Sequence, residues 1–168
     1  MPHLSNLIGS DMFLNKYETL LSNAEKENIT INETSHFSGT RIKGLYCDGY
    51  IAINKNIETE TERACILAEE LGHYYTSSGD IIDQSSVSNR KQEYRARFWA
   101  YEKLVSLHGI ISAYESGCRS AFEMSEYLDV TEDFFREAME SYRSKYGICK
   151  IVGDYAIYFE PIGILKMK

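Results

Sequence analysis

The sequence lacks the features that mark several specialised classes of protein. Its four cysteines form no C-x-x-C pair, so we expect reduced thiols and no cysteine zinc site. The net charge of −7 argues against a general binder of nucleic acid or anionic membranes. No apolar run approaches the length of a membrane span, and the N-terminus has no signal-peptide pattern. These absences predict a cytoplasmic globular protein that binds neither nucleic acid nor membrane directly.

The composition and the residue patterns favour one α+β domain. Hydrophobic residues make up 43% of the 168 residues, which is enough to build a core, and we expect residues 1–168 to form a single domain. The dipeptide Asp48-Gly49 predicts a hairpin turn, and a second hairpin is expected around Gly153-Asp154. The predicted helices span residues 11–27, 59–76, 89–107, 109–117, 119–128 and 131–145, and the predicted strands lie within 28–34, 41–54 and 148–159.

The most informative stretch is ILAEELGHYY, residues 66–75, in one of the predicted helices. On a helix, Glu69 and His73 are four residues apart and point from the same face, with Glu70 beside them. This spacing is typical of the H-E-x-x-H helix of zinc peptidases, in which the residues at i and i+4 hold the metal and the Glu is the general base. Here Glu69 replaces the first His, so the motif reads E-E-x-x-H.

A simpler interpretation of this stretch is a solvated carboxylate pair, with His73 interacting with the helix dipole near the C-terminus. The neighbouring residues favour a functional site. Leu67, Ala68, Leu71 and Tyr75 form an apolar stripe, which predicts that the helix is partly buried. Carboxylates beside such a stripe are costly to bury unless a cation or hydrogen bonds compensate them.

A third metal ligand is predicted on the helix that follows. Glu93, Ala96, Ala100 and Leu104 fall on one face of this helix. The two alanines allow close packing on another helix and place Glu93 near the contact, whereas the alternative is an ordinary exposed Glu in the first turn. Other potential ligands are more simply explained as loop, terminal or helix-end residues; these are His3, His36, Asp80, Asp83 and His108.

With these two helices placed, the chain resembles the ImmA/IrrE family of metallopeptidases, which is frequent in phages and mobile elements. The resemblance rests on ILAEELGHYY and on KQEYRARFWA, residues 91–100. The family shows H-E-L-G-H followed by E-x-x-A-x-x-F-A, and Glu93, Ala96 and Ala100 match the second segment. The similarity covers about residues 40–108 and, more loosely, the C-terminal tail.

The resemblance implies an α+β, zincin-like fold: a small antiparallel sheet packed on helices, an active-site helix, and C-terminal helices with a β-hairpin. The metallopeptidase core would span residues 28–108 and the extension residues 109–168. His73 and Glu93 are implied as metal ligands and Glu70 as the catalytic base, with Glu69 in the first ligand position. We expect one divalent metal, Zn²⁺ first and Mn²⁺ as the alternative, because two carboxylates with one imidazole favour a harder ion.

The implied function is that of a metal-dependent endopeptidase that hydrolyses a peptide bond in a transcriptional repressor of a phage or mobile element. Tyr74 or Tyr75 is a candidate to support the oxyanion. Replacement of the first His favours an alternative, a non-catalytic binding module that grips a repressor without cutting it. A third interpretation is an unrelated α+β domain with a chance motif. The motif spacing, the helix order and the hairpin position argue against it, because all three agree with the metallopeptidase pattern.

Overall fold

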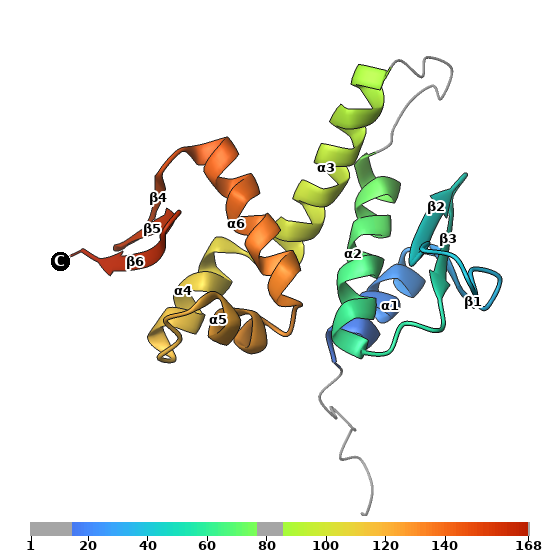
Figure 1. The fold of residues 1–168 in the computed structure, drawn as a ribbon, viewed down its shortest axis with the longest axis horizontal. Helices are drawn as coiled ribbons and strands as arrows, with labels where there is room; N and C mark the ends of the chain where they lie inside the picture. The colour runs from blue at the N-terminus through green and yellow to red at the C-terminus, as the bar shows by residue number, and fades with distance from the viewer. Residues whose placement is uncertain (1–14, 77–85, 168) are drawn as a thin grey trace, which may run out of the picture.

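The structure is a computed structural model that describes residues 15–76 and 86–167 (Figure 1). It confirms the predicted α+β class. The elements in chain order are α1 (Lys16–Lys26), β1 (Thr30–Thr34), β2 (Gly44–Cys47), β3 (Tyr50–Asn54), α2 (Glu60–Thr76), α3 (Ser86–Leu104), α4 (Leu107–Glu115), α5 (Ala121–Leu128), α6 (Glu132–Tyr146), β4 (Cys149–Val152), β5 (Tyr155–Phe159) and β6 (Ile162–Lys166).

The first sheet has the strand order β1-β3-β2 and lies against α1 and α2 (Figure 1). Its β2–β3 hairpin turns at Asp48 and Gly49, which have φ values of 48° and 83°, as the sequence predicts. Strand β1, however, pairs parallel to β3, so the sheet is mixed rather than wholly antiparallel as expected. The reason is that residues 35–43 pass over the C-terminal end of β3. Strand β2 therefore begins on the side of β3 opposite β1, and the hairpin returns as β3 between them.

The second sheet, with the order β4-β5-β6, lies at the opposite end of the helical layer (Figure 1). Its β4–β5 hairpin turns at Gly153 and Asp154, as predicted. The predicted strand region, residues 148–159, omits the third strand of this sheet, because the chain turns at Glu160–Pro161 and continues as β6. Ile162 and Ile164 pack against the core from this strand, which explains why the chain stays in the sheet.

Helices α2 and α3 form the central contact of the molecule. A Cβ atom added at Gly72 of α2 would lie 2.1 Å from the carbonyl oxygen of Ala96 in α3. The two backbones therefore touch, because neither residue places a large side chain between them. Ala96 and Ala100 are both fully buried, as the predicted close-packing face of α3 requires.

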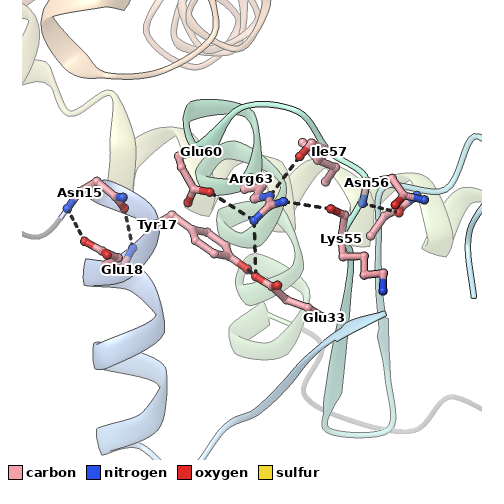
Figure 2. A network of polar contacts seen from close by, with 10 residues as sticks. Asn15, Tyr17, Glu18, Glu33, Lys55, Asn56, Ile57, Glu60 and Arg63 are labelled. Atoms are coloured by element: carbon pink, nitrogen blue, oxygen red, sulfur yellow. Dashed lines mark hydrogen bonds and ion pairs between the residues drawn. The ribbon is translucent and has the colours of Figure 1, made fainter. Parts of the chain in front are cut away.

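The N-terminal end of α2 is anchored to the first sheet through Arg63 (Figure 2). The guanidinium of Arg63 donates to the carbonyl oxygens of Ile57 at 3.1 Å and Lys55 at 2.9 Å, and lies 3.9 Å from the carboxylate of Glu33 in β1. The hydroxyl of Tyr17 in α1 donates to the same carboxylate at 2.7 Å. One carboxylate thus joins α1, β1 and α2, which fixes the start of the helix that carries the motif.

The C-terminal helices are joined to α1 through a partly buried lysine. Lys16 donates from Nζ to the carbonyl oxygens of Leu104 and Leu128, at the C-terminal ends of α3 and α5. Carbonyl groups in the last turn of a helix have no partner within the helix, and a cation there also interacts favourably with the helix dipole. Burial lowers the pKa of Lys16, and Asp129 opposes that effect.

We predict that Gly72→Ala lowers the free energy of unfolding by about 3 kcal/mol, because the new methyl group meets backbone that cannot rotate away. The matched control is Gly163→Ala in β6, where a Cβ atom has no neighbour within 4 Å and the backbone is not left-handed. Urea unfolding of the two variants beside the wild type measures the difference. Equal stabilities of the two variants would contradict the close approach of α2 and α3.

Candidate functional site

Two of the predicted metal ligands come together across the α2–α3 contact. His73 lies in the last turn of α2, and its Nε2 atom is 3.7 Å from the carboxylate atom Oε2 of Glu93 in α3. Two ligands of one tetrahedral Zn²⁺, each about 2.0–2.2 Å from the metal, lie roughly 3.4 Å apart. An imidazole nitrogen and a carboxylate oxygen are ordinary ligands for such an ion, so this pair fits a divalent metal.

Glu69, the residue in the first ligand position, is half-buried on the same face of α2 as His73. Burial raises the pKa of Glu69, and Arg97 of α3 is the positive group that opposes this most strongly, while Glu137 and Glu93 reinforce it. In residues 15–76 and 86–167, no three His, Cys, Asp or Glu side chains form a group that could hold a metal ion. The structure therefore brings together two metal donors, His73 and Glu93. Glu69 lies nearby, and the positive charge of Arg97 partly compensates its negative charge.

Glu70, the predicted base, lies against the edge strand β2. A Cβ atom added at Gly44 would meet Oε1 of Glu70 and Cγ2 of Ile66, both at 2.7 Å, so a larger residue here would displace the side chains of Glu70 and Ile66. The backbone N–H of Tyr46 donates a hydrogen bond to the Glu70 carboxylate. Burial raises the pKa of Glu70 to about 7, with a further contribution from the negative charge of Glu69.

Tyr46 also contacts the site through its ring. The ring is nearly parallel to the His73 imidazole, with 6° between the planes and 6.5 Å between the centroids. Tyr74 meets Tyr46 edge-on at 6.1 Å. Tyr75, by contrast, donates from its hydroxyl to Glu27, the C-cap residue of α1, at 2.6 Å, and its ring stacks on Trp99 of α3. Of the two tyrosines considered as oxyanion donors, Tyr74 is the one that contacts Tyr46, whose ring lies parallel to the His73 imidazole.

An open cavity of about 400 Å³ extends from the site between α3 and α6. Glu93, Arg97 and Glu137 line it, together with Tyr101, whose hydroxyl donates to Glu137 at 2.8 Å. Tyr101 is almost fully buried, and burial followed by this hydrogen bond raises the pKa of its hydroxyl. The floor of the cavity is therefore a fixed polar surface with more negative than positive charge.

Sequence reasoning missed Arg97 and Tyr46. Arg97 follows Glu93 by four residues, a helical spacing that places both on one side of α3 and that could have identified it. Tyr46 gives no such signal, because its contact with His73 joins a strand to a helix through tertiary packing. Of the residues set aside as ligands, His36 and His108 are exposed, whereas His3, Asp80 and Asp83 lie outside the described residues.

The comparison with known families identifies the class of this protein. Residues 23–140 match the family Peptidase M78, described as the IrrE N-terminal-like domain. The match covers more than half of the 168 residues, and the chain belongs to this family. No curated protein matches the chain, and no solved structure does.

Membership of this family makes the chain a peptidase-type, metallopeptidase-like domain and implies a divalent metal. Helices α2 and α3, which carry the four predicted site residues, lie inside the matched range, whereas β4, β5 and β6 lie beyond it. Among the described helices, none combines the length and the apolar character that crossing a bilayer requires.

We predict that the metal-free protein loses stability as the pH rises from about 4.5 to 7, through the titration of Glu70. The folded protein holds the Glu70 proton up to a pKa of about 7, against an ordinary value of 4.5, so the unfolded state loses its proton first. The loss is on the order of 2 kcal/mol after allowance for the exposed part of the side chain, and the contribution of Glu70 becomes constant above about pH 8.

Urea unfolding in chelator at pH 5, 6, 7 and 8 measures this pH dependence. Glu70→Gln should remove most of the decline and raise stability at pH 8, because an amide carries no charge to bury. Glu126→Gln is the control, since Glu126 is an exposed carboxylate on α5. A decline in Glu70→Gln as steep as in the wild type would assign the effect to other groups.

Proposed function

We propose that this protein is a metal-dependent endopeptidase and that its substrate is a transcriptional repressor of a phage or mobile element. The observation that carries the proposed reaction is the approach of His73 Nε2 to Glu93 Oε2, with Glu70 on the same helix beside an open strand edge. Membership of a peptidase family supports the reaction class. The choice of a repressor as substrate rests on the sequence resemblance to members from phages and mobile elements.

His73 and Glu93 would hold the metal, with Glu69 as the third ligand. A divalent metal bound there supplies a Lewis acid for the scissile carbonyl group. Zn²⁺ is the first choice because imidazole and carboxylate suit it, and Mn²⁺ is the alternative because two carboxylates make a harder donor set. Glu69 serves as a ligand only if its carboxylate leaves the influence of Arg97.

Glu70 acts as the general base in this proposal. A carboxylate with a pKa of about 7 has enough basicity near neutral pH to take a proton from the attacking water. The same group then gives the proton to the leaving amine nitrogen. Its burial against Gly44 excludes bulk water from one side of the carboxylate and keeps it in place on the helix.

Strand β2 provides a surface for the peptide substrate. It pairs with β3 on one side only, so in the described structure its other edge has no strand partner. The N–H of Tyr46 on that edge donates to Glu70 of α2, and Glu70 also packs against the face of the strand at Gly44. An extended peptide that adds to this edge would bring its backbone beside the base, and it would pair with edge groups other than the Tyr46 N–H, which Glu70 occupies.

A second candidate function is a non-catalytic binding module on the same scaffold. The observation that favours it is the charge compensation of Glu69 by Arg97. An arginine that neutralises the first ligand position competes with a cation for that carboxylate. In this case the same strand edge and cavity would hold a repressor without hydrolysing it.

The first test is the metal content of the purified wild type, measured by elemental analysis beside His73→Ala. We expect about one equivalent of zinc or manganese in the wild type. The variant should lose the metal, because His73 supplies the imidazole ligand of the proposed site. His108→Ala is the control, since His108 is exposed on α4. A folded wild type that takes up no metal after reconstitution would contradict the peptidase.

The second test separates the enzyme from the binding module. Glu70→Gln should lower peptide-bond hydrolysis on the order of 10³-fold, because the base is lost while the metal ligands remain. Metal content should stay at the wild-type value, the melting temperature should not fall below that of the wild type, and Glu126→Gln should keep full activity. Cleavage is measured on candidate repressors by mass spectrometry. A wild type that binds a repressor without cutting it, with Glu70→Gln acting equally well, would identify the binding module.

A further inference from the structure

Tyr46 contacts both Glu70 and His73. It lies in β2, opposite Ile51 of β3, and is partly buried against the core. Its backbone N–H binds the Glu70 carboxylate, and its ring lies parallel to the His73 imidazole. These are different parts of one residue, so the positions of the base and of the ligand are linked through the hairpin.

The strand pairing explains why the N–H of Tyr46 is available to Glu70. Asn54 donates its backbone N–H to the carbonyl oxygen of Lys43 at 2.8 Å, which identifies that pair as hydrogen-bonded. In an antiparallel ladder such pairs alternate, so Leu45 and Cys47 bond to β3 whereas Gly44 and Tyr46 direct their backbone groups to the outer edge. The N–H of Tyr46 on that edge donates to Glu70, and the Glu70 side chain also packs against the face of the strand at Gly44.

His73 needs a neighbour to hold its ring. It is three residues from the end of α2, and its side chain is 21% exposed. A histidine that binds a metal usually donates its other ring N–H to a carboxylate or carbonyl oxygen, which fixes the plane of the ring. Among the described residues nothing accepts such a hydrogen bond from His73, and the parallel ring of Tyr46 is the contact that remains.

We propose that Tyr46 is a positioning residue of this site: its ring fixes the imidazole plane of His73 so that Nε2 faces Glu93, while its backbone N–H holds Glu70. This inference rests on the proposed function for its catalytic meaning. The Tyr46 hydroxyl has no hydrogen-bond partner among the described residues, so the aromatic ring and not the hydroxyl carries the role. Offset or parallel rings within about 7 Å stabilise each other beyond simple burial.

The first measurement uses the metal-free full chain and needs no activity. Proton–carbon correlation spectra of the imidazole groups, with His73 assigned through His73→Gln, report the ring current of Tyr46. We expect the His73 signals to differ from those of the exposed His36 and His108 in the wild type and in Tyr46→Phe. In Tyr46→Leu they should move to the positions of the exposed histidines.

The matched control is Tyr50→Leu, because Tyr50 is in the same hairpin but is 59% exposed. If Tyr46→Leu leaves the His73 signals in place, or if Tyr50→Leu moves them as far, the ring contact is wrong and the proposal is overturned. Melting temperatures confirm that each variant is folded. Tyr46→Met, whose unbranched side chain is longer and more adaptable, replaces Tyr46→Leu if the latter does not fold.

The second measurement is the affinity for Zn²⁺, by competition with a chelating dye, and the absorption spectrum of the Co²⁺-loaded protein. Tyr46→Leu should bind Zn²⁺ about 10- to 100-fold more weakly, as expected for loss of a residue that orients a ligand, and its Co²⁺ spectrum should change. Tyr46→Phe should stay within about twofold of the wild type, because the ring is retained.

Each outcome assigns the failure to one hypothesis. If Tyr46→Phe binds Zn²⁺ as weakly as Tyr46→Leu, the hydroxyl acts and the proposed role of the ring is overturned. If Tyr46→Leu keeps the affinity of Tyr50→Leu, Tyr46 does not position the ligand. A wild type that binds neither Zn²⁺ nor Co²⁺ contradicts the proposed function, whereas the imidazole spectra still decide whether Tyr46 holds His73.

Discussion

The contact between Gly72 and Ala96 is the constraint on which the site depends. Because Gly72 has no Cβ atom, the two helices can approach until their backbones touch. A Cβ atom at this position would lie 2.1 Å from the Ala96 carbonyl oxygen. His73 follows Gly72 directly, and Glu93 precedes Ala96 by one turn, so the approach brings their side chains to 3.7 Å. A wider spacing, such as larger interface residues impose, would separate these two donors and leave each on its own helix.

The second constraint is the concentration of negative charge that this packing creates. Adjacent carboxylates at Glu69 and Glu70 are both partly buried, and burial raises the pKa of each. Such a pair is stable only with a proton, a positive side chain or a metal ion beside it. Arg97 compensates Glu69, and the N–H of Tyr46 stabilises the charged form of Glu70. The replacement of a neutral His by Glu69 therefore changes the charge balance of the site as well as one ligand.

Tyrosines connect the elements around the site in two different ways. In one group the hydroxyl donates to a carboxylate on a neighbouring element, as from Tyr17 to Glu33 and from Tyr101 to Glu137. These bonds join α1 to β1 and α3 to α6, and each satisfies a polar group at the border of the core. Tyr46 differs, because its ring makes the contact with His73 and its hydroxyl has no partner in the described residues. This difference explains why an aromatic count alone does not indicate which tyrosine belongs to the site.

Much of the scaffold was determined by local sequence. The 3.6-residue period predicted α2 and the buried alanine face of α3, and Asp48-Gly49 predicted the β2–β3 hairpin, because backbone preferences act within a few residues. The E-E-x-x-H spacing likewise places the motif on one helix face, because residues four apart on a helix share a face whatever surrounds them. Tertiary structure alone decided the parallel pairing of β1 with β3, the addition of β6, the position of Arg97 near Glu69 and the ring of Tyr46 on His73. Each of these depends on how separate elements pack, and no periodic pattern records which distant surfaces meet when the core is formed.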